Sequence, residues 1–155
     1  MRSTIPLKAK CFFVAWVFGW FIAVVVPSVL IAVTGLSTQT QGVHLLRDVF
    51  DVADEVSPAA KLSFAVAFAG ALIFVRVLLS IRTIYLDASV GMVCMLVVVA
   101  LLPVDWSGGF GVGLSGSRFA PLPTVFYALG GLLAGATVSI SETRCIRKSV
   151  ATVDH

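Results

Sequence analysis

Long apolar stretches alternate with short charged segments along this chain of 155 residues. A membrane-spanning helix needs about 20 mainly apolar residues to cross a hydrocarbon core roughly 30 Å thick. Four stretches meet this requirement, at residues 12–35, 62–81, 88–104 and 120–140. Each is expected to be an α-helix, because backbone N–H and C=O groups cannot stay unpaired in lipid. The pattern predicts an all-α membrane protein with four transmembrane helices in one bundle, forming a single domain over residues 1–155.

The composition agrees with a lipid environment. Hydrophobic residues make up 59% of the chain and charged residues only 12%, whereas about a quarter of the residues of a soluble domain are charged. The net charge of +3 comes without a stripe of Lys and Arg interleaved with aromatic residues, so we expect no nucleic-acid binding. The lipid bilayer is the first expected partner.

The distribution of basic residues predicts the orientation. One side of the proposed membrane holds three basic residues, Arg47, Lys61 and Arg118, and the other holds eight: Arg2, Lys8, Lys10, Arg76, Arg82, Arg144, Arg147 and Lys148. The positive-inside rule then places both chain ends in the cytoplasm, N-in and C-in. We expect a multi-pass protein of the bacterial inner membrane. A cleaved signal peptide is the alternative for the first stretch, but its 24 residues exceed the roughly 7–15 of a signal h-region.

The two outer segments differ in character. Residues 43–56 place Leu45, Leu46 and Phe50 on one helical face and acidic residues largely on the other, which predicts a short amphipathic outer helix between the first and second spans. Residues 106–119 are rich in glycine and favour tight turns. Their GxGxxG spacing lacks the strand and helix of a dinucleotide site. The candidates for outer recognition are Asp48, Asp51, Asp54, Glu55 and Trp106.

Arg76 lies inside the second apolar stretch, and an ionisable residue at membrane depth is a functional candidate by default. Only five residues separate it from the inner end of the stretch, about 8 Å of helix. Its long side chain can therefore extend to the cytoplasmic headgroups, and we favour this snorkelling interpretation over a functional role.

Small residues recur at four-residue spacing in two of the predicted helices. Such faces let helices approach closely. We favour packing within the bundle over a homodimer interface. The candidate packing residues are Ser63, Ala67 and Ala71 in the second span and Gly130, Gly131 and Gly135 in the fourth.

No convincing catalytic or metal-binding set emerges from the sequence. His44 and Asp48 have helical spacing, but a solvated acidic face is the commoner outcome, so we predict no metal and no cofactor. Cys11, Cys94 and Cys145 show neither CxxC spacing nor an even count, and we expect them to be reduced. The apolar stretches carry no Asp, Glu or His near their middle, which argues against a familiar proton-coupled carrier.

These observations favour a small non-enzymatic protein that acts by binding a membrane partner, either another membrane protein or a second copy of itself. Accessory subunits, regulators and immunity factors are of this kind. The alternative is a small oligomeric channel or exporter, suggested by the glycine faces and Arg76. Architecture alone does not choose between them.

Overall fold

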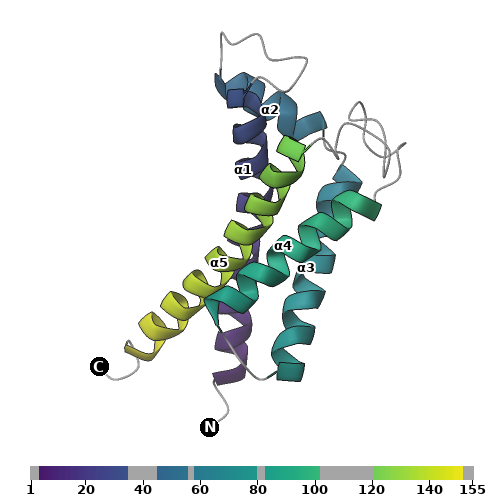
Figure 1. The fold of residues 1–155 in the computed structure, drawn as a ribbon. Coiled ribbons are helices and arrows are strands. Elements are labelled where there is room, and N and C mark those ends of the chain that lie inside the picture. The colour runs from purple at the N-terminus through teal and green to yellow at the C-terminus, as the bar shows by residue number, and fades with distance from the viewer. Residues whose placement is uncertain (1–3, 35–44, 56–57, 80–82, 102–120, 152–155) are drawn as a thin grey trace.

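The computed structural model describes five stretches of the chain, and all of their residues except Thr83 are helical (Figure 1). The described residues are 4–34, 45–55, 58–79, 83–101 and 121–151. The helices are α1 (Thr4–Thr34), α2 (Leu45–Glu55), α3 (Pro58–Leu79), α4 (Ile84–Leu101) and α5 (Pro121–Ala151).

Four of these helices are long and apolar enough to cross a membrane. The segments that qualify are Lys8–Thr34, Lys61–Leu78, Ile84–Leu101 and Thr124–Ser149. For the residues that the structure describes, the prediction of an all-helical fold with four such helices is therefore confirmed. Helices α1 and α5 have 31 residues each and extend beyond the apolar stretches that predicted them. Both extensions mix apolar residues with charged and polar ones, which is why the apolar stretches do not include them.

Helix α4 begins four residues earlier than its apolar stretch, at Ile84. The hydroxyl of Thr83 accepts a hydrogen bond from the Leu86 N–H at 3.2 Å, and its carbonyl accepts one from the Asp87 N–H at 3.1 Å. Thr83 thus satisfies N–H groups that the start of a helix leaves unpaired. This cap brings Asp87 into the first turn of α4.

Helix α5 packs against both α1 and α4, and α3 packs mainly against α4 (Figure 1). Helices α1 and α5 are antiparallel, because Gly130 lies against Pro27 and Cys145 is bonded to Cys11. The first turns of α1 and the last turns of α5 consequently lie at the same end of the molecule (Figure 1).

Glycine makes the closest of these helix contacts. A side chain at Gly135 would overlap the backbone carbonyl of Asp87, and one at Gly131 would overlap that of Gly91. The backbones of α4 and α5 can approach this closely only because neither position carries a Cβ. Gly130 makes the equivalent approach to Pro27 of α1.

The apolar core lies where α1, α3, α4 and α5 meet. Two indole N–H groups join α1 to α3, because Trp16 donates to the Ala65 carbonyl and Trp20 to the Lys61 carbonyl, both at 3.1 Å. The buried residues of this core are Ala15, Ala23, Phe64, Phe68, Leu72, Met95, Val99, Ala134 and Val138.

Candidate functional site

The strongest concentration of polar chemistry in the described helices is a buried cluster of three charged side chains, Arg76, Asp87 and Glu142. Nη2 of Arg76 donates to Oδ2 of Asp87 at 2.7 Å, and Nε donates to Oδ1 at 3.3 Å. Nη1 of Arg76 donates to Oε2 of Glu142, also at 2.7 Å. The side chains of Arg76, Asp87 and Glu142 are only 8%, 1% and 5% exposed. We call this the charged cluster.

Each member of the charged cluster comes from a different helix. Arg76 lies in the last turn of α3 and Asp87 in the first turn of α4, so the short connection between these helices brings the two side chains together. Glu142 belongs to α5, which packs along α4. Helix α1 closes the site, because the guanidinium of Arg76 lies 5.3 Å from the ring centroid of Phe12, within the range of a cation–π interaction.

The hydrogen bonding of the charged cluster compensates the desolvation of its members. Two N–H groups of Arg76 engage the Asp87 carboxylate as a fork, which is the strongest geometry for this pair. Glu142 has a further interaction besides its bond to Arg76. No buried side-chain nitrogen or oxygen in the described part of the chain lacks a partner. The cluster can hold α3, α4 and α5 together.

The position of Arg76 differs from the snorkelling interpretation. Its side chain is directed between the helices toward two carboxylates and does not extend to the surface. The sequence reasoning missed these partners because Asp87 precedes the third apolar stretch by one residue and Glu142 follows the fourth by two. One signal was available. The predicted topology places Arg76, Asp87 and Glu142 on the same side of the membrane, each near the end of its span, where adjacent helices can bring them together.

The structure corrects the expectation that the cysteines are reduced. Cys11 of α1 and Cys145 of α5 form a disulfide across 134 residues, with their Cα atoms 5.6 Å apart. Spacing along the chain could not reveal this pair, because only the antiparallel packing of α1 and α5 makes the two residues neighbours. Cys94 is a free cysteine. The disulfide lies next to Phe12 in sequence and so ties α1 to α5 beside the charged cluster.

The predicted small-residue faces fall in different environments. Gly130, Gly131 and Gly135 of α5 lie at close contacts with α1 and α4. In α3, by contrast, Ser63 and Ala67 are exposed and Ala71 is half-buried. Gly70 is the next small residue on that face, and a side chain there would meet no atom of another helix within 4 Å. Helix α3 thus presents Ser63, Ala67 and Gly70 as exposed small residues, and the carbonyl of Ala67 also accepts a hydrogen bond from the Cys94 thiol of α4 at 4.0 Å.

The candidates for outer recognition are only partly within the described structure. Asp48 of α2 is buried, and the Asp51 carboxylate lies 3.9 Å from the Arg47 guanidinium. The side chains of Asp54 and Glu55, and the whole of Trp106, lie outside the described residues, as does His44.

The apolar face of α2 is divided between two environments. Val52 packs against Ile31 and Ala32 of α1, whereas Leu46 and Phe50 are exposed. One edge of α2 is therefore fixed to the spanning helices, while the other faces away from them.

The described residues contain no group of three His, Cys, Asp or Glu side chains that could hold a metal ion. Searches for relatives give no further indication of a ligand. No protein-family model matches the chain, and neither the curated proteins nor the solved structures contain a match.

Proposed function

We propose that this chain is a small, non-enzymatic protein of the bacterial inner membrane that acts by binding another membrane protein. Its four long apolar helices form one bundle with both ends in the cytoplasm, and α2 lies on the outer surface. The eight-to-three division of basic residues supports this orientation. The roles that fit are accessory subunit, regulator and immunity-type factor.

The observation that carries this proposal is the exposed small-residue face of α3, made of Ser63, Ala67 and Gly70. Exposed apolar side chains alone would say little, because lipid tails are as apolar as leucine. Small residues are different, since they let a second helix approach closely enough for extensive van der Waals contact and for a hydrogen bond from Ser63. The corresponding glycines of α5 already serve contacts inside the molecule.

Co-purification in a mild detergent tests the proposal. The wild-type chain should recover a partner at fixed stoichiometry. The double variant Ala67→Leu/Gly70→Leu should lose it, because the added side chains fill the space that a partner helix would occupy. Val97→Leu, an enlargement at an exposed position of α4, is the control and should retain the partner. An isolated monomer under gentle extraction would contradict the proposal, as would equal recovery by all three chains.

A small oligomeric channel or exporter is the second candidate, and the charged cluster favours it. Intramembrane carboxylates and arginines commonly mark ion or proton pathways. Purified protein in liposomes should then pass protons or small cations, and Asp87→Asn should reduce the flux while the helical content stays unchanged. The absence of flux from the wild-type protein would exclude this candidate and leave the binding proposal untouched.

A further inference from the structure

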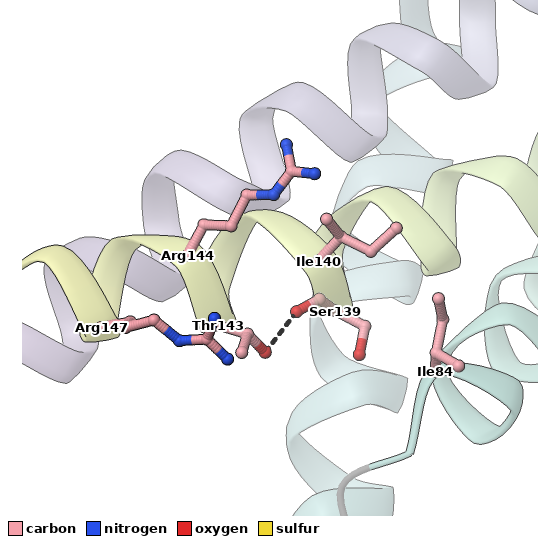
Figure 2. A pocket seen from close by; sticks show the side chains of 6 residues that line it. All are labelled: Ile84, Ser139, Ile140, Thr143, Arg144 and Arg147. Atoms are coloured by element: carbon pink, nitrogen blue, oxygen red, sulfur yellow. Dashed lines mark hydrogen bonds between the residues drawn. The ribbon is translucent and has the colours of Figure 1, made fainter.

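A second polar site lies on the outside of α5, at the end where α1 begins and α5 finishes (Figure 2). It is a surface hollow of about 380 Å³, within the range of about 300–1,000 Å³ that is usual for small-ligand sites. The residues that line it are Ile84 of α4 and Ser139, Ile140, Thr143, Arg144 and Arg147 of α5. We call it the arginine hollow.

The electrostatics of the arginine hollow select an anion. Arg144 and Arg147 come from adjacent turns of α5, and neither forms an ion pair within the described part of the chain. None of the six lining residues is acidic. A guanidinium presents a planar fork of N–H donors that matches the oxygens of a phosphate group. Arg147 extends along the face of α5 that carries Thr143 and Ser139, whereas Arg144 extends from the other side of the helix (Figure 2). The fork of Arg147 therefore faces the hydroxyl groups, and Arg144 adds a second positive charge at the edge of the hollow.

One hydroxyl group of the hollow, that of Ser139, fits the same ligand. Thr143 donates its hydroxyl proton to the backbone carbonyl of Ser139 at 2.7 Å, which fixes its orientation. The Ser139 side chain lines the hollow one turn before Thr143 in α5 (Figure 2). Its hydroxyl can donate to a phosphate oxygen held by the arginines.

The apolar part of the hollow indicates what carries the phosphate. Ile84 and Ile140 lie at one side of the lining and are both partly exposed. Arg144 lies 23 residues after Pro121, where α5 begins, or about 35 Å along the helix. A hydrocarbon core is roughly 30 Å thick, and the headgroups extend it to about 40–45 Å. If α5 crosses the bilayer, the arginines are at headgroup depth and the isoleucines lie nearer the acyl chains.

We propose that the arginine hollow binds the phosphate group of an anionic phospholipid, with Arg147 and Ser139 on the phosphate, Arg144 adding positive charge at the edge of the site, and Ile84 and Ile140 against the first acyl carbons. Basic pockets between helices on the cytoplasmic side of a membrane bind lipid headgroups in this way. This site is separate from the exposed face of α3, and neither proposal depends on the other.

Native mass spectrometry of the purified, delipidated full-length protein tests the site. We expect phosphatidylglycerol to be retained about tenfold more strongly than phosphatidylcholine. Arg144→Gln/Arg147→Gln should abolish this preference. The matched control is Lys8→Gln/Lys10→Gln, which removes two exposed charges near the same end and should keep it. Equal loss in both double variants would show general charge attraction and overturn the proposal.

Further measurements distinguish the source of the phosphate and guard against a folding defect. Inorganic phosphate is titrated by calorimetry. Tight binding that depends on Arg144 and Arg147, together with no preference among lipids, would assign the site to a soluble phosphate compound and contradict the lipid proposal.

Ile84→Ser should weaken phosphatidylglycerol retention. Arg144→Lys/Arg147→Lys keeps the charge but loses the forks, and should bind lipid at an intermediate level. If it binds no better than the glutamine variant while its thermal unfolding matches the wild type, the geometry proposed for the arginines is wrong.

Discussion

Nη1 of Arg76 in α3 donates a 2.7 Å hydrogen bond to Oε2 of Glu142 in α5, across 66 residues of chain. The same guanidinium holds both carboxylate oxygens of Asp87 in α4. Buried charges are stable only while they are paired, and lipid offers no substitute partner. The charged cluster therefore favours one arrangement of α3, α4 and α5 over alternatives in which these helices separate or rotate.

Replacement of Arg76 tests this conclusion. We expect Arg76→Gln to lower the free energy of unfolding by about 3–5 kcal/mol, because it removes the cation that compensates two buried carboxylates. Titration with sodium dodecyl sulfate, followed by circular dichroism, measures the change. Arg47→Gln is the control, since Arg47 is exposed and its pair with Asp51 spans 3.9 Å; it should change the stability by at most about 1 kcal/mol. Equal effects of the two substitutions would contradict a stabilising cluster.

The glycine contact between α4 and α5 gives a second prediction. Gly135→Ala places a Cβ against the Asp87 carbonyl and should lower the free energy of unfolding by about 1–3 kcal/mol, as overpacking of a tight contact does. Gly70→Ala makes the same chemical change where no atom lies within 4 Å, and should leave stability unchanged or raise it by up to about 1 kcal/mol. Thermal unfolding in detergent compares the two. A Gly135→Ala protein as stable as the Gly70→Ala protein would show that the helices are farther apart.

The disulfide predicts the thiol content of the oxidised protein. Denatured but unreduced protein should react with one maleimide per chain, at Cys94, and with three after reduction. Mass spectrometry of the labelled protein gives the count. Cys145→Ser should expose Cys11 as a second thiol and lower stability by about 2–5 kcal/mol, the usual effect of losing a native disulfide. Three reactive thiols before reduction would mean that the bond does not form.

Topology is tested by reporter fusions. Fusions after Val56 and after Ser115 should behave as external and a fusion at His155 as cytoplasmic, because of the distribution of basic residues. All three positions lie outside the described residues. An external signal from the fusion at His155 would reverse the orientation.

The location of the disulfide provides an independent check on orientation. Disulfides persist in oxidising compartments, whereas the cytoplasm keeps thiols reduced. If the shared end of α1 and α5 is cytoplasmic, alkylation in intact cells should trap Cys11 and Cys145 as thiols, and the bond should form when an oxidant removes two electrons and two protons. A bond already present in cells would place this end outside.

The sequence was most informative where helix formation depends on local composition. It predicted four long apolar helices and the short helix near residues 43–56. It was less informative about helix ends, because the extra turns of α1 and α5 mix apolar residues with charged and polar ones and so fall outside the continuous apolar stretches.

Sequence by itself determined that this chain forms four apolar helices, because a backbone in lipid must bond internally and because apolar length sets the number of crossings. Tertiary structure alone decided that Arg76 meets Asp87 and Glu142, that Cys11 bonds to Cys145, and that the glycines of α5 are covered while Ser63 and Ala67 are not. The physical reason is that α1 and α4 are apolar on nearly every side. Lipid-facing and protein-facing residues then look alike in sequence, and only the packing of the helices distinguishes them.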